Sequence, residues 1–299
     1  MKFVLRLKLS VWLLLMVFVA MTLATSAETQ RLKVFTSILP QKYFVEQIAG
    51  DLVDVEVLVG PGMSPHTFEP LPQQMSQLSR AAAFFMIGVP FEQALVNRLA
   101  AICPDLKFID TGRNVVRRSM SEPDSDHQHS DDCVHDAGSP DPHIWLDPIN
   151  AITISEAVAG ALLEIMPESS TQINDNLQKL TDELKALDQQ LTIALASVKG
   201  QTMLVFHPAF GYFAARYGLK QQSVEVEGKE PGPRQLAELI RKCRQLNVHV
   251  VFVQKQFPVA AAETVARSIN GAVVSIDPLA EDYVENLRRL GEAILAGIK

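Results

Sequence analysis

Cysteine is scarce in this chain, which has only Cys103, Cys133 and Cys243 among its 299 residues. The number is odd, so at most one intramolecular disulfide can form and at least one thiol is left over. A fold held together by several disulfides is therefore excluded. Cys103 and Cys243 fit a role as small buried apolar residues equally well, and the sequence leaves the pairing open.

Long apolar runs are absent after the first 27 residues. Those residues have a basic start, an unbroken apolar run at 11–20 and small residues before Glu28. This order is typical of a secretory signal peptide, and the run is short for a membrane span. We predict a signal peptide at 1–27, cleaved near Ala27, and an exported mature protein. No cysteine lies near the cleavage point, so a lipid-anchored start is not expected, and we expect no later membrane span.

Positive charge is in deficit. The net charge is −7, and removal of the three basic residues of the signal peptide makes it −10. An acidic exported protein is a poor binder of nucleic acid. The deficit is greatest at 119–141, which holds seven acids and three histidines (His127, His129, His135) but no lysine or arginine. This segment has too few apolar residues to bury itself, so we predict a mobile loop.

Strands and helices alternate in two stretches of the mature chain, which indicates βαβ units and parallel sheets. We predict an α/β fold of two Rossmann-like lobes, at 28–166 and 200–299, joined by one long backbone helix at 167–199. The first lobe should end with a helix capped by Asn150.

The long helix carries apolar residues at alternating spacings of four and three: Ile173, Leu177, Leu180, Leu184, Leu187, Leu191, Ala194 and Val198. At about 1.5 Å per residue it would be roughly 40 Å long. The repeat also fits a coiled coil. We favour a helix packed along both lobes, because the α/β units on either side would use the stripe as core.

Three histidines lie where metal ligands are expected. His66 and His207 follow predicted strands, His143 ends a loop and opens a helix, and Asp277 follows another strand. In open α/β sheets, ligands bind outside the carboxyl ends of strands. Each residue alone has an ordinary structural explanation. Together, three imidazoles and one carboxylate would fill a tetrahedral metal site.

Motifs of hydrolytic enzymes are missing. We find no HExxH helix, no GxSxG elbow and no phosphate loop. A catalytic zinc keeps one position open for water, whereas four protein ligands leave none. Glu69 near His66 is a candidate base without further support. We therefore expect metal sequestration and no enzymatic activity.

Five segments carry a resemblance to a known family. They are Val34–Ile38, Gly62–Pro70, Asp141–Pro148, Phe206–Phe213 and Asp277–Leu279. With these segments, the chain resembles the zinc- or manganese-carrying solute-binding proteins of bacterial ABC importers over nearly its whole mature length. It looks most like a periplasmic zinc-binding component. The family has two α/β lobes joined by one long helix and an acidic, histidine-bearing loop before its second ligand.

The resemblance implies that His66, His143, His207 and Asp277 are the ligands, with His127, His129 and His135 as auxiliary ligands in the loop. Three nitrogens to one carboxylate favour Zn²⁺ over Mn²⁺, and Fe²⁺ stays open. The implied function is high-affinity capture of zinc in the periplasm by a monomer that delivers it to a membrane permease. The alternatives are a manganese or iron carrier, or an adhesin or metal-dependent hydrolase on the same scaffold.

Overall fold

The structure is a computed structural model that describes residues 31–120, 140–225 and 231–298. The predicted signal peptide lies outside these residues, as does most of the predicted loop at 119–141. The loop histidines His127, His129 and His135 are therefore not described, and their auxiliary role stays a prediction.

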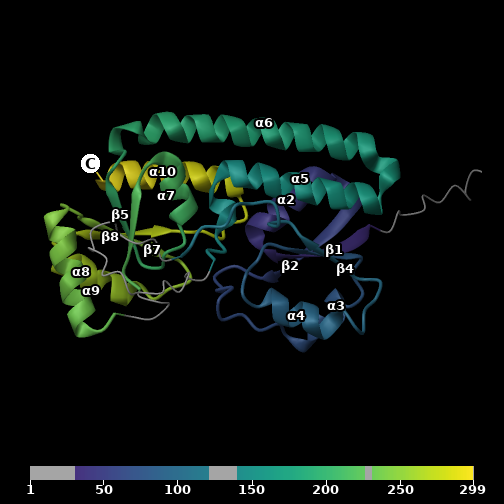
Figure 1. Cartoon of the computed structure of the whole chain (residues 1–299), viewed down its shortest axis with the longest axis horizontal. Helices are drawn as coiled ribbons and strands as arrows, with labels where there is room; N and C mark the ends of the chain where they lie inside the picture. The colour runs from purple at the N-terminus through teal and green to yellow at the C-terminus, as the bar shows by residue number, and fades with distance from the viewer. Residues whose placement is uncertain (1–30, 121–139, 226–230, 299) are drawn as a thin grey trace, which may run out of the picture. The chain divides into compact units, whose positions relative to one another are not determined.

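Two four-stranded sheets form the framework, and every strand pair in both sheets is parallel (Figure 1). The first sheet has the order β2-β1-β3-β4, with strands β1 (Leu32–Ile38), β2 (Val53–Val59), β3 (Ala83–Met86) and β4 (Lys107–Asp110). The second repeats this order as β6-β5-β7-β8, with strands β5 (Thr202–Val205), β6 (Lys220–Ser223), β7 (Val250–Gln254) and β8 (Ala272–Ile276). The predicted fold class is confirmed.

Helices connect the strands, as parallel pairing requires. In the first half these are α2 (Leu39–Ala49), α3 (Pro72–Leu78), α4 (Glu92–Leu99) and α5 (Pro148–Ile165). In the second half they are α7 (Gly211–Tyr217), α8 (Pro233–Gln245), α9 (Val259–Ser268) and α10 (Tyr283–Ile298). Short 3₁₀ turns lie at Gly50–Leu52 (η1), Ile144–Leu146 (η2), Pro167–Ser169 (η3) and Ala196–Val198 (η4). Because central parallel strands are covered on both faces, they read as apolar runs such as Ala83–Phe85.

The long helix α6 (Ser170–Leu195) runs along α5 and α10 (Figure 1) and also contacts α2. Its apolar stripe is core within this chain. Ile173, Leu180, Leu184, Leu187 and Leu191 are buried, and the last buried residue of α6 is Leu195, whereas Ala194 is exposed. The predicted stripe is wrong at Ala194. A straight helix turns every 3.6 residues, so a strict seven-residue repeat drifts off the buried face along its length.

Helix α5 differs from the prediction at its start. Asp147 is the cap, because its carboxylate Oδ1 accepts the backbone N–H of Ile149 at 2.8 Å, and Pro148 occupies the first helical turn. The predicted cap, Asn150, lies inside the helix.

The same helix is also apolar and long enough to cross a membrane by length and composition, with a mean hydropathy of 1.3 over 18 residues. The expectation that no later stretch has such a composition is therefore wrong. However, α5 packs against α2 and α6, and its buried residues belong to the core.

One hydrophobic core joins the two halves. It extends from β1 through α2, α5 and α6 to α10, and a second, smaller core covers α8 and α9. Phe44 of α2 packs edge-on against Tyr283 of α10, with ring centroids 4.7 Å apart. The two halves therefore share buried packing through these helices.

Candidate metal centre

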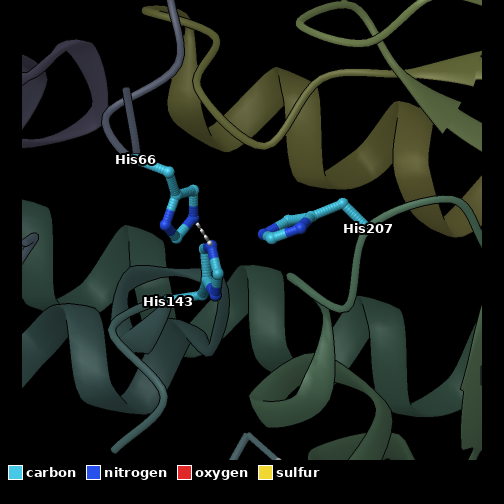
Figure 2. A group of neighbouring side chains, drawn as sticks. All are labelled: His66, His143 and His207. Atoms are coloured by element: carbon cyan, nitrogen blue, oxygen red, sulfur yellow. Dashed lines mark hydrogen bonds between the residues drawn. The ribbon is translucent and has the colours of Figure 1, made fainter. Parts of the chain in front are cut away.

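Three imidazoles meet between the carboxyl ends of the two sheets (Figure 2). One ligand atom from each of His66, His143 and His207 lies within 4.8 Å of the others, and the Nε2 atoms of His66 and His143 are 3.3 Å apart. With zinc–nitrogen bonds of about 2.0–2.1 Å, the nitrogens of a tetrahedral site are about 3.3–3.4 Å apart. The spacing of this pair fits such an ion.

The fold brings these residues together from three places. His66 lies in the loop between β2 and α3, His143 directly precedes the 3₁₀ turn at 144–146, and His207 follows the end of β5. His66 and His207 therefore stand at carboxyl ends of parallel strands, where ligands of open α/β sheets bind. The sequence correctly anticipated this arrangement for the three histidines.

His143 is held by Asp141. The carboxylate Oδ1 accepts from the ring Nδ1 at 2.7 Å and from the backbone N–H of His143 at 2.9 Å. Both residues are buried. A proton on Nδ1 that donates to a carboxylate leaves the Nε2 lone pair free for a metal, and it fixes the orientation of the ring.

His207 is held from three sides. Its ring Nδ1 lies 2.6 Å from the Glu225 carboxylate, and Phe257 stacks on the ring at 5.1 Å between centroids. The Gln254 side chain accepts from the backbone N–H of His207 at 3.1 Å and donates to its carbonyl at 2.5 Å. Its Nε2 is buried and has no hydrogen-bond partner among the described residues. Such an atom is expected where a metal binds.

The strand register explains the contacts of His207. Val205 of β5 pairs with Ser223 of β6 and with Phe252 of β7. Two residues further along each chain, the same register places Glu225 and Gln254 beside His207.

His66 is the least restrained of the three. Its backbone N–H contacts the Ser64 hydroxyl at 3.3 Å, no carboxylate of the described residues holds its ring, and it is only half-buried. Burial, and then the neighbouring rings of His143 and His207, lower the pKa of His66 to about 3. Burial also lowers the pKa of His143, against the opposing effect of Asp141. Both rings are therefore neutral at pH 7, as metal binding requires.

The histidines line a small cavity with a volume of about 20 Å³. Its other walls include Ser64, Trp145, Ala209, Gln256, Phe257 and Leu279. A cavity needs about 10–15 Å³ to hold one water. The space suits an ion with at most one small companion.

Asp277, the fourth predicted ligand, lies outside this group of three histidines. Its Oδ1 accepts from the Gln256 side chain at 3.0 Å and from the backbone N–H of Leu279 at 2.9 Å, while Oδ2 lies 3.4 Å from the Lys255 ammonium. These contacts hold the carboxylate in the turn that follows β8. Direct ligation by Asp277 stays a prediction.

Sequence reasoning missed the residues that support the ligands. Asp141 begins one of the resemblance segments but was given no role, although its position two residues before His143 is a local signal for a side chain that bonds the backbone N–H of the histidine. Glu225 and Gln254 carry no local signal, because only the strand register brings them to His207.

Comparison with known proteins finds similarity to zinc-binding proteins in both sequence and structure. The family model described as ZnuA, zinc-uptake complex component A periplasmic, matches residues 34–297. A solved structure titled as a crystal structure of ZnuA is 35% identical, covers 90% of this chain and 100% of its own, and has a TM-score of 0.81. A deletion mutant of ZnuA with zinc bound is also 35% identical, covers 90% of this chain and 99% of its own, and has a TM-score of 0.82.

A curated relative from Streptococcus pneumoniae, the zinc-binding lipoprotein AdcA, is 28% identical over 268 residues. The match covers 88% of this chain and 52% of AdcA, so this chain spans about half the length of that relative.

Proposed function

Because this chain belongs to the ZnuA family of periplasmic zinc-uptake components, we propose that it captures zinc in the periplasm and delivers it to the permease of an ABC importer. Zinc is the cargo of this protein. His66, His143 and His207 hold it through Nε2. The observation that carries the proposal is the convergence of three imidazoles, whose ligand atoms lie within 4.8 Å of one another and of which the His66–His143 pair, at 3.3 Å, has the spacing expected around a tetrahedral ion.

The donor set supports zinc over the alternatives. Imidazole nitrogens suit zinc, copper, iron and nickel, whereas manganese prefers carboxylate and water. The described group contains three nitrogens and no carboxylate oxygen. Manganese and iron remain competitors to be tested in the same titration.

The cavity supports a carrier over a hydrolase. A volume of about 20 Å³ around the three histidines suits an ion with one small companion. The buried carboxylates Asp141 and Glu225 hydrogen-bond the Nδ1 atoms of two ligands, so neither is free to act as a general base toward a substrate.

A zinc titration of the purified mature protein tests the proposal. Metal-free protein is titrated in competition with a chromophoric chelator, with Mn²⁺ and Fe²⁺ as rival cargoes. We expect one tight zinc per chain and a large loss of affinity for His143→Ala and for His207→Ala, because each removes one nitrogen from the shell.

The matched control is His249→Ala, which removes an exposed histidine at the start of β7. This variant should bind zinc as the parent does. If His66→Ala, His143→Ala and His207→Ala also bind one zinc with parental affinity, the three histidines are not the site. Import is then tested in zinc-starved cells that lack their own carrier, where the parent should restore growth and His143→Ala should not.

A further inference from the structure

The three histidines fill three of the four positions of a tetrahedral ion. In zinc sites with three protein ligands, a water occupies the fourth position. The cavity has room for one such companion. A side chain that faces the fourth position could hold this water.

Gln256 follows β7 and lines the cavity with the histidines. Its Nε2 donates to Asp277 Oδ1 at 3.0 Å. An ionised carboxylate can only accept hydrogen bonds, so the NH₂ group of the amide must face Asp277 and the amide oxygen must face the other way. This oxygen, Oε1, is buried and has no hydrogen-bond partner among the described residues.

Two buried polar atoms without a partner among the described residues, Nε2 of His207 and Oε1 of Gln256, therefore belong to residues that line one small cavity. Buried polar groups are almost always hydrogen-bonded, and each exception calls for an explanation such as a missing water or ion. A metal satisfies the nitrogen, which is a lone-pair donor. The amide oxygen needs a hydrogen donor, and a metal-bound water is one.

The orientation of Gln256 is fixed from outside the cavity. Asp277 accepts from the backbone N–H of Leu279 at 2.9 Å and lies 3.4 Å from the Lys255 ammonium, and its carbonyl accepts from Asn286 at 2.6 Å. With Asp277 held in this way, the Gln256 amide cannot flip without placing its oxygen against a carboxylate.

We propose that Gln256 is a positioning residue of the metal site. Its Oε1 accepts a hydrogen bond from the water in the fourth coordination position of the ion held by His66, His143 and His207, and Asp277 acts through Gln256. The proposal rests on the function proposed above. It also has a consequence for delivery, because a bound water is exchangeable and leaves one position open to a ligand exchange during handover.

Two alternatives are less favoured by the geometry. Direct ligation by Gln256 would use an amide oxygen, which is not among the usual zinc ligands. Direct ligation by Asp277 would require its carboxylate to leave Gln256, the Leu279 amide and Lys255.

The variant Gln256→Met tests the proposal, because methionine has a similar length and no amide oxygen. Two measurements are made: zinc affinity by competition titration, and the visible spectrum of bound Co²⁺, which reports the ligands of the ion. We expect zinc affinity to fall about tenfold, as for the loss of one hydrogen bond to a polarised group, and the Co²⁺ spectrum to change. Gln256→Ala, which is smaller, serves if the methionine disturbs the loop.

The matched control is Gln178→Met. Gln178 also donates its Nε2 to an aspartate, Asp182 at 2.9 Å, but it lies on the exposed face of α6. This variant should have the parental affinity and spectrum.

A double-mutant cycle then tests whether Asp277 acts through Gln256 or binds the ion directly. Asp277→Asn should weaken zinc binding in the parent and have little further effect in Gln256→Met. Parental affinity and spectrum for both Gln256 variants would overturn the proposal, and so would an equal loss for Asp277→Asn in both backgrounds, which would make Asp277 a direct ligand. The two proposals fail on different results. The proposed function fails only if His143→Ala still binds zinc with parental affinity, whereas the role of Gln256 fails on the results named above.

Discussion

Replacing Glu225 tests how much metal affinity comes from a carboxylate that is expected never to touch the metal. Its Oε2 lies 2.6 Å from Nδ1 of His207, and both side chains are 8% exposed. A hydrogen bond to an ionised group is shorter and stronger than a neutral one. It keeps the Nδ1 proton in place, so that Nε2 points to the ion as a lone-pair donor.

The size of the effect follows from this role. Loss of an outer partner of a metal-ligating histidine typically costs about 10–100-fold in metal affinity, or roughly 1.4–2.8 kcal/mol. Glu225→Gln keeps the shape and an oxygen acceptor but removes the charge, so we expect the lower end of this range. Glu225→Ala leaves Nδ1–H buried without a partner, so we expect the upper end.

The assay is a competition titration of the metal-free variants with zinc, followed by melting curves with and without zinc. The control is Glu238→Gln, which removes an exposed carboxylate of α8 that forms a surface ion pair with Arg234 at 3.3 Å. Zinc should raise the melting temperature of the control as much as that of the parent, and less for the Glu225 variants. Parental affinity in both Glu225 variants would refute the reasoning.

Three further predictions concern acid, the core and export. Folding lowers the pKa of His66 from 6.5 to about 3, so between these values the unfolded chain binds more protons than the folded metal-free protein. Its stability should therefore fall as the pH drops below about 6.5, by at most about 1.4 kcal/mol per pH unit. Urea titrations at pH 7.5 and 5 should show a smaller pH effect in His66→Asn, and equal effects would contradict this. In α6, Leu184→Ala removes a fully buried side chain and should cost about 2–5 kcal/mol of unfolding free energy. Ile193→Ala, at a position 71% exposed, should change it by under about 0.5 kcal/mol, and similar denaturation midpoints for the two would count against the assigned core. Mass spectrometry of the protein from the cell envelope should find the N-terminus near Glu28, and an intact Met1 would defeat the export prediction.

Much of the fold could be read from the sequence because its signals are local. The strands β2 and β8 coincide with valine-rich segments at 53–59 and 272–276. The helix errors have local causes as well. Asp147 with Pro148 is a stronger start signal than Asn150, because the aspartate side chain can accept an N–H of the first turn and proline fits there.

The convergence of the three histidines was predictable, and the residues that hold them were not. Histidines at strand ends can be placed by a rule about sheets. Glu225 and Gln254 reach His207 only because β5 pairs with β6 and β7 in one particular register. The local sequence does not predict that register. For Asp277, the strand-end position predicts a ligand, and its contacts with Gln256 and Lys255 are a further tertiary feature that the sequence does not predict.

The way the metal leaves follows from how unequally the structure holds the three histidines. Trp145, two residues after His143, donates to the carbonyl of Pro278 at 2.8 Å, and the Tyr283 hydroxyl donates to the Trp145 carbonyl at 2.5 Å. Separating the two halves would break these buried bonds and divide a shared core, which is costly compared with small local shifts. His66, by contrast, is held by a contact of its backbone N–H to the Ser64 hydroxyl and by a contact of its ring to His143. Metal exchange is therefore expected to proceed by displacement of the loop that carries His66, with His143 and His207 fixed in place.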